Sequence, residues 1–241
     1  MRVYGIHAVL EALRAGRVTA LQIAARDDDR IAEIVGLAES QGVPVRRVGG
    51  ADLDRAAGGG RHQGVVADVA ERDEALTIDD LVGGARGAPL IVVLDGIEDP
   101  HNVGAIARTA DAAGADGLVR QSRHAARLAG AAARASAGAL AHVRVAEVVN
   151  IARALEELKE AGVWTIGLAG DAPKTYSDLD LTLPTAFVVG AEGGGLRRLV
   201  RARCDWLASI PMAGHVQSLN VSVATGIALF EAVRQRRQIR R

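Results

Sequence analysis

The spacing of apolar residues divides the chain into two regions. In the first, up to about residue 70, short periodic segments alternate with polar turns. Apolar residues at helical spacing predict helices, and strict alternation of apolar and polar residues predicts strands. We expect helices at residues 7–14 and 31–40, and strands at 21–24, 43–48 and 64–69. The first region is therefore predicted to be a small α/β unit.

The second region begins at Leu90, where nearly unbroken apolar runs replace the alternating ones. Runs of this kind suit strands that are buried on both faces of a parallel sheet. We expect such strands at 90–94, 163–167, 186–190 and 206–210, separated by helices at 103–113, 151–161, 196–203 and 221–237. Residues 71–88 are first charged and then rich in glycine, which predicts a linker with room for one helical turn. The expected domains are therefore residues 1–70 and 89–241.

The composition is that of a globular protein of a reducing compartment. Of the 241 residues, 49% are hydrophobic but only 2% are aromatic, so the core must consist mainly of Ala, Val, Leu and Ile. The single cysteine, Cys204, excludes an internal disulfide, and its flanks predict a packed thiol rather than a nucleophile. No apolar run reaches the ~18 residues of a membrane span, and the first residues lack the apolar core of a secretory signal. We therefore expect a cytoplasmic protein with no membrane contact.

The charged residues are informative through their distribution. The net charge is zero, with 29 basic and 29 acidic residues, so the overall charge does not indicate that the protein binds nucleic acid. The stretch 117–145 nevertheless lacks Asp and Glu while containing Arg120, Arg123, His124, Arg127, Arg134, His142 and Arg144. This stretch either contacts phosphates or forms a solvated helix face. The basic C-terminus, residues 234–241, is expected to be a frayed, solvated tail.

Three polar segments follow predicted strands of the second region. They are Asn102-Val-Gly-Ala-Ile-Ala-Arg108, Gly190-Ala-Glu-Gly-Gly-Gly-Leu196 and Ile210-Pro-Met-Ala-Gly-His-Val-Gln-Ser-Leu-Asn-Val-Ser222. Ligands of open parallel sheets bind beyond the carboxyl ends of the strands, so these segments predict a site at that edge. No dinucleotide fingerprint, phosphate loop or metal-ligand spacing occurs, and we expect no metal.

Each segment also has a purely structural interpretation. Ser218 and Asn220 are expected to open the last helix as caps, and Asn102 could be another helix cap. Glu192 could be an exposed loop carboxylate, and the three glycines at 193–195 could either admit a ligand close to the backbone or form a plain tight turn. The joint occurrence of the three segments favours the functional interpretation.

Together the three segments resemble the ordered motifs of the SpoU family of RNA ribose 2′-O-methyltransferases, within the SPOUT superfamily. The resemblance extends from Leu90 to about Arg237. The beginning, Val3-Tyr-Gly-Ile-His-Ala-Val-Leu-Glu-Ala-Leu13, and His62-Gln-Gly-Val-Val-Ala67 are similar to the subgroup that methylates guanosine in bacterial 23S rRNA. The small first unit resembles the ribosomal-protein-like RNA-binding domain that is often fused to RNA-modifying enzymes.

The resemblance implies a parallel-sheet domain with a deep trefoil knot, which ordinary topology rules would not predict. It also implies S-adenosylmethionine as cofactor, 23S rRNA as substrate, and a homodimer with its active site at the subunit interface. The residues that match the cofactor-binding positions are Gly190, Ile210, Met212 and Leu219. The residues that match the catalytic region are Asn102, Arg108, Glu192, Ser218 and Asn220. The alanine-rich stretch 128–139 departs from the more basic helix common in close relatives, which puts RNA contacts there in doubt.

These residue types suit methyl transfer to a hydroxyl, which requires orientation of both partners and removal of the hydroxyl proton. Arg108 suits phosphate binding or support of an oxyanion, because a guanidinium loses its proton only above pH ~12. Glu192 could orient Arg108 or the substrate, and the identity of the general base stays open. The alternatives are a tRNA target, an rRNA site that protects against an antibiotic, or a non-catalytic RNA-binding protein. Arg108, Glu192 and Asn220 argue against the last of these.

Overall fold

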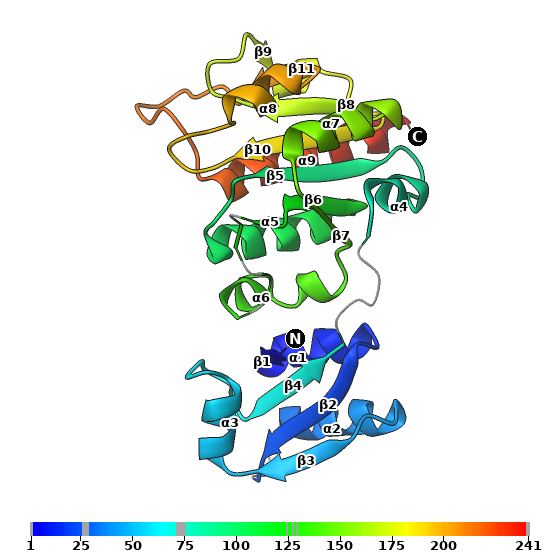
Figure 1. Ribbon diagram of the computed structural model, residues 1–241, viewed down its shortest axis with the longest axis vertical. Coiled ribbons are helices and arrows are strands. Elements are labelled where there is room, and N and C mark those ends of the chain that lie inside the picture. The colour runs from blue at the N-terminus through cyan, green and yellow to red at the C-terminus, as the bar shows by residue number, and fades with distance from the viewer. Residues whose placement is uncertain are drawn as a thin grey trace.

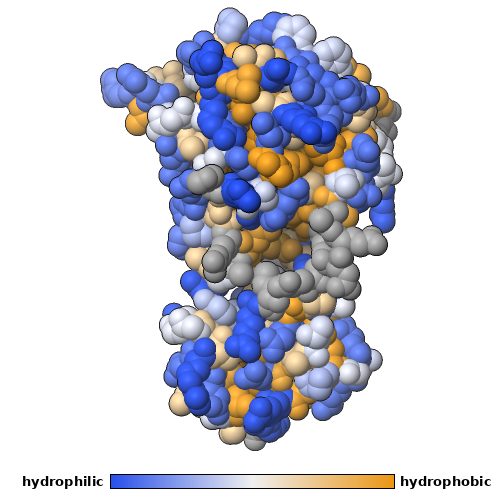
Figure 2. Space-filling model, in the orientation of Figure 1, coloured by the Kyte–Doolittle hydropathy of each residue, from blue (hydrophilic) through white to orange (hydrophobic). Residues whose placement is uncertain are grey.

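The computed structural model describes residues 2–25, 29–70, 76–123, 125–126, 128 and 130–239. It contains two sheets, which form the centres of a smaller N-terminal unit and a larger C-terminal unit (Figure 1). Figure 2 shows hydrophilic residues over both units, rather than gathered on one of them. None of the helices in the described part of the chain combines the length and the apolar character that a membrane span requires.

The smaller unit has four strands in the order β1-β4-β2-β3. These strands are β1 (Arg2–Tyr4), β2 (Val18–Ala24), β3 (Val45–Val48) and β4 (Val65–Val69). Helices α1 (Ile6–Arg14) and α2 (Asp29–Ser40) cover one face of this sheet, and α3 (Gly50–Ala56) covers the other. Alternation along β4 explains the two cores, because Val65 and Ala67 face α1 and α2 while Val66 faces Leu53 of α3.

The larger unit has seven strands in the order β7-β6-β5-β10-β8-β11-β9, and all of their pairings are parallel. The strands are β5 (Leu90–Asp95), β6 (Gly117–Gln121), β7 (Val145–Val148), β8 (Trp164–Leu168), β9 (Lys174–Thr175), β10 (Thr185–Gly190) and β11 (Trp206–Ser209). Helices α5 (Pro100–Ala113) and α9 (Val221–Ile239) pack on one face, and α4 (Ile78–Gly83), α7 (Ile151–Glu160) and α8 (Arg198–Arg203) pack on the other. Strand β5, which lies between β6 and β10, is buried along its whole length, as its apolar run predicts.

The basic stretch 117–145 does not form a single solvated helix face, because it begins with strand β6. Arg120 in β6 is only 6% exposed, and its Nη1 donates to the carbonyl of Ala126 at 2.7 Å. Arg144 donates to the carbonyl of Asp80, and Arg134 lies over the ring of Tyr4 at 4.9 Å from its centroid. Arg127 and His124 lie outside the described residues. Much of this positive charge therefore stabilises the protein's own structure.

The C-terminal helix also differs from the expected frayed tail. It continues to Ile239, and the guanidinium of Arg236 donates to four backbone carbonyls at 2.7–3.0 Å, those of Ala88, Pro89, Leu181 and Leu183. These carbonyls lie beside the starts of β5 and β10, so the contacts fasten the end of α9 to the sheet. Within the segment predicted as a linker, α4 packs on the larger sheet with Ile78 and Leu81 buried.

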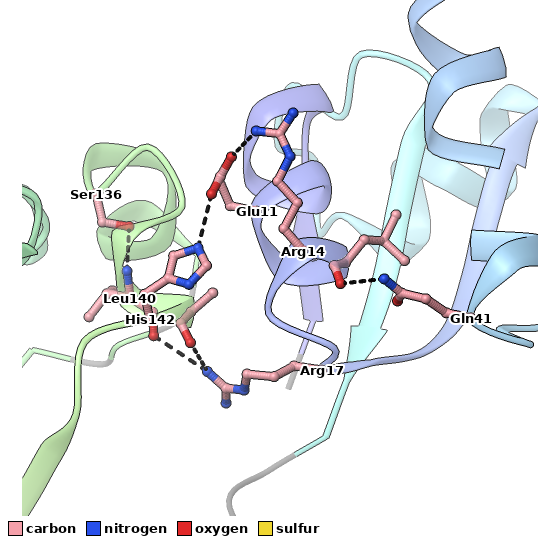
Figure 3. Close-up of polar contacts among 9 residues, drawn as sticks. Glu11, Arg14, Arg17, Gln41, Ser136, Leu140 and His142 are labelled. Atoms are coloured by element: carbon pink, nitrogen blue, oxygen red, sulfur yellow. Dashed lines mark hydrogen bonds and ion pairs between the residues drawn. The ribbon is translucent and has the colours of Figure 1, made fainter. Parts of the chain in front are cut away.

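The alanine-rich stretch forms α6 (Ala131–Ala135) and the 3-10 turn η1 (Ala139–Ala141), which lie against the smaller unit. Ala133 is buried in the core of that unit. Across the same boundary, Nε2 of His142 contacts Oε2 of Glu11 at 2.9 Å, and Arg17 donates to the carbonyls of Leu140 and Ala141 (Figure 3). A Cβ at Gly104 of α5 would lie 2.5 Å from the Cβ of Ala135 in α6, and a Cβ at Gly138 would lie 2.4 Å from the Cβ of Glu11 in α1, so neither contact has room for a larger residue.

Candidate active site

A pocket of about 600 Å³ lies at the carboxyl edge of the larger sheet. This volume is within the range of small-molecule and cofactor sites. Its walls come from the segments that follow β8, β10 and β11, which are adjacent in the sheet. The predicted residues that line the pocket are Gly190, Glu192, Ile210, Met212, Ser218, Leu219 and Asn220. The sheet order therefore brings two of the three sequence segments to one cavity.

The glycine-rich segment after β10 is a tight turn that also borders the pocket. The amide of Gly195 donates to the carbonyl of Ala191 at 2.8 Å, and Gly193 and Gly195 have φ of 76° and 61°. A Cβ at Gly190 would lie 2.1 Å from the carbonyl carbon of Gly195, so only glycine fits there. A Cβ at Gly194 would meet no atom within 4 Å. The geometry of the turn thus explains why residues 190, 193 and 195 are glycine. Steric contact does not require glycine at position 194.

Three side chains from separate segments form a hydrogen-bonded network at this edge. Oε1 of Glu192 accepts from Nδ2 of Asn102 and from Nδ2 of Asn220, each at 2.8 Å. Nδ2 of Asn220 also lies 3.0 Å from Oδ1 of Asn102. Asn102 is buried, whereas Glu192 and Asn220 are exposed. The network therefore presents one fixed carboxylate at the mouth of the pocket.

Local structure explains how each amide is held. Helix α5 begins at Pro100 with Asp99 as its N-cap, so Asn102 lies within the first turn and is not a cap. Asn220 does cap α9, because its Oδ1 accepts from the amide of Ser222 at 2.9 Å. The prediction that Ser218 opens this helix is wrong, because α9 begins at Val221 and Ser218 lies in the preceding exposed loop.

Arg108 lies apart from this network within the chain. Six residues beyond Asn102 on α5 place it about 9 Å along the axis and about 240° around it. Its side chain is exposed, does not line the pocket, and has no hydrogen bond or ion pair among the described residues. Within one subunit, Arg108 is therefore not part of the network that contains Glu192.

Two ion pairs near the pocket have no counterpart among the predicted residues. Asp95, fully buried at the end of β5, accepts from the amide of Arg197 at 2.8 Å and from its Nε at 2.6 Å. This contact fixes the chain just after Leu196, which lines the pocket. Asp95 could have been predicted from the sequence, because it is a carboxylate at the end of an apolar run. The second pair joins Asp171 to Arg201, and the sequence carries no comparable signal for it.

The cysteine is not part of the site. Burial raises the pKa of the Cys204 thiol to about 12, and its Sγ donates to the carbonyl of Val200. The thiol is therefore protonated at neutral pH, in agreement with the expected packing role. Among the described residues, no group of three or more His, Cys, Asp or Glu side chains is placed to hold a metal ion.

Comparison with known proteins assigns the family. The SpoU rRNA Methylase family matches residues 89–230, and a domain described as RNA 2′-O ribose methyltransferase substrate binding matches residues 2–75. The chain therefore belongs to the SpoU rRNA methylase family, whose members are RNA 2′-O-ribose methyltransferases. This confirms the resemblance seen in the three segments and the expected class of fold and enzyme. The trefoil knot stays a prediction.

Individual relatives match almost the whole chain. A 23S rRNA (guanosine-2′-O-)-methyltransferase of Burkholderia sp is 47% identical over 97% of this chain and 96% of the relative. The enzyme of the same name from Pseudomonas aeruginosa is 45% identical over 98% of this chain and 96% of its own length. The crystal structure of the SpoU methyltransferase AviRb from Streptomyces viridochromogenes, in complex with AdoMet, superposes with a TM-score of 0.84. That structure is 29% identical and covers 99% of this chain and 91% of its own.

Proposed function

We propose that this protein transfers a methyl group from S-adenosylmethionine to the ribose 2′-hydroxyl of a guanosine in 23S rRNA. The observation that carries the proposal is the Asn102–Glu192–Asn220 network at the mouth of a cofactor-sized pocket. The curated relatives with this activity match both units at 45–47% identity, which favours 23S rRNA over a tRNA target. The expected cytoplasmic location is where such a substrate occurs.

The pocket fits this cofactor in shape and chemistry. Apolar side chains at Ile210 and Leu219 and the backbone around Gly190 would hold the adenosine portion, and Met212 lies at the same wall. Gly194 also lines this pocket, and a Cβ there would meet no atom within 4 Å. When bound, the cofactor supplies an electrophilic methyl group, so the protein needs to supply no metal and no covalent nucleophile.

The side chains of the network would orient the substrate hydroxyl. Two amide donors fix Oε1 of Glu192, while Oε2 has no hydrogen-bond partner among the described residues. Oε2 would accept a hydrogen bond from the 2′-hydroxyl and hold its oxygen towards the pocket. Ser218, in the exposed loop that lines the same pocket, would contribute a second hydroxyl contact to the substrate.

We further propose that the active enzyme is a homodimer, because Arg108 is not near Glu192 in its own subunit. Exposed Val223 and Phe230, 50% and 49% accessible, lie seven residues apart on one face of α9. A symmetry mate that covers this face would sit next to the start of α9 and the network. Arg108 of the partner subunit would then bind the phosphate of the target nucleotide or support the developing oxyanion. Sedimentation that shows a fully active monomer would exclude this arrangement.

The smaller unit would bind the RNA and present the target loop. Sequence-specific RNA recognition uses unstacked bases and phosphates over a wider surface than the cofactor pocket offers. The contacts between Glu11, Arg17 and the η1 region would keep this unit at a fixed position beside the methyltransferase unit.

The proposal is tested with labelled S-adenosylmethionine and full-length 23S rRNA transcribed in vitro, which carries no modification. Tritium in the RNA, mapped to one guanosine by its resistance to alkaline cleavage, is the expected result. Transfer to tRNA transcripts but not to 23S rRNA would replace the substrate assignment. Binding of RNA with neither cofactor binding nor transfer would instead identify a non-catalytic RNA-binding protein.

A further inference from the structure

The charged residues that line the pocket are few. They are Asp171, Glu192 and Arg201, and Glu192 is already held by the two asparagines. The other two bind each other through two parallel hydrogen bonds. Nη1 of Arg201 lies 2.8 Å from Oδ1 of Asp171, and Nη2 lies 3.0 Å from Oδ2. A two-point arginine–carboxylate contact fixes both distance and orientation.

This pair joins two different walls of the pocket. Asp171 belongs to the loop that follows β8, and Arg201 belongs to α8, which follows the glycine turn after β10. The backbone of the β8 loop is held near its base, where Ala169 donates to the carbonyl of Ala208 at 3.0 Å. Beyond that base, a Cβ at Gly170 would lie 3.8 Å from the carbonyl of Gln217, so the loop faces the segment before α9. The Asp171–Arg201 pair therefore fastens the tip of the β8 loop to α8.

Global stability does not account for the pair. The side chains of Asp171 and Arg201 are 72% and 37% exposed, and ion pairs at such exposure contribute only about 0–1 kcal/mol. The hydrogen bond from Arg201 lowers the pKa of Asp171, and the same bond raises the pKa of Arg201. Both groups are thus charged throughout the neutral range, and the pair persists under working conditions.

We propose that Asp171 and Arg201 are positioning residues that hold the β8 loop closed against the cofactor and thereby set cofactor affinity. The inference rests on the proposed use of S-adenosylmethionine. The two residues act as one unit through the loop, and neither takes part in the reaction. Breaking the pair releases the loop, so the cost of ordering it is added to each binding event. At the upper end of the range for exposed pairs, cofactor affinity falls about fivefold.

The test is calorimetric titration of the full-length protein with S-adenosylmethionine. The variants are Asp171→Asn, Arg201→Gln, the Asp171→Asn/Arg201→Gln double variant, and Asp171→Glu. The matched control is Arg203→Gln, because Arg203 is on the same helix, is 43% exposed and pairs with Glu156, but does not line the pocket. Thermal melting without cofactor checks that every variant is folded.

A positioning pair predicts that each neutral single variant raises Kd about three- to fivefold and that the double variant is no worse than either single one. Asp171→Glu, which can still reach Arg201, restores most of the affinity, and kcat at saturating cofactor stays within twofold for all variants. Arg203→Gln leaves Kd unchanged.

Two results would overturn the inference. Unchanged affinity in both single variants would show that the pair does not act on the pocket. Losses that multiply in the double variant would show that each side chain contacts the cofactor independently. If the unmodified protein fails to bind S-adenosylmethionine, the proposed function fails instead, so the two failures are distinguishable.

Discussion

Replacing Glu192 by glutamine separates orientation from charge at the proposed active site. The glutamine carbonyl can still accept from Asn102 and Asn220, so the network keeps its shape. The charge is lost, however, and an NH₂ group replaces the free Oε2. A hydrogen bond to a charged group contributes about 1.5–3 kcal/mol, against about 0.5–1.5 kcal/mol for a neutral one. If Oε2 accepts from the substrate hydroxyl, kcat/KM should fall at least tenfold, since each 1.36 kcal/mol is a factor of ten.

The alanine variant gives the upper limit of the same effect. Glu192→Ala removes the acceptor shared by both amides as well as the substrate contact, and a loss above a hundredfold is expected. Rates are measured as methyl incorporation into 23S rRNA at saturating cofactor, with Glu39→Gln on α2 as an exposed acidic control far from the pocket. If Glu192→Gln retains the normal rate while Glu192→Ala loses it, Glu192 only holds the asparagines and the proposed substrate contact is wrong.

Three further predictions concern separate parts of the structure. Arg108→Ala should nearly abolish methyl transfer while leaving the Kd for S-adenosylmethionine within a few-fold, because Arg108 lies outside the pocket; near-normal transfer would remove it from the reaction. Gly190→Ala should destabilise the protein by more than about 2 kcal/mol, because its Cβ would overlap the backbone of Gly195, and an unaltered urea midpoint would contradict the close approach. Arg236→Met should lose about 3 kcal/mol and lower Tm by about 6–12 °C, since four carbonyls lose a charged donor; Arg237→Met, which changes an exposed neighbour, should have little effect.

The sequence predicts those elements whose environment is uniform. Strands β5 and β10 are buried on both faces, so every position is apolar and the run itself marks the strand. Strand β6 was not predicted, because Arg120 interrupts its apolar run. The guanidinium of Arg120 is buried because the fold places the carbonyl of Ala126 next to it. Burial of a charged group depends on a hydrogen-bond partner outside its own strand, which periodicity does not reveal.

In the candidate site, the sequence likewise predicts the residues but not the contacts between them. Asn102, Glu192 and Asn220 were predicted as site residues because they follow predicted strands. Their mutual hydrogen bonds, however, depend on the sheet order that places β10 beside β5. The segment that contains Arg108 was expected to contribute to a site at this edge, whereas helix geometry turns Arg108 away from Asn102. The pair of Asp171 and Arg201 was not predicted, because two ordinary surface residues become a unit only through the packing of the β8 loop on α8.

Under the proposed function, the side chain of Asn220 links catalysis to the order in which the chain is made. Its bond to Asn102 spans 118 residues, and it caps a helix that ends at Ile239. Contacts at such sequence separation form late, because a long loop must close first. During synthesis, a chain whose helix α9 has not yet emerged has no complete network. A nascent enzyme, or one truncated before α9, would therefore not methylate RNA, and activity would appear only once α9 has joined the fold.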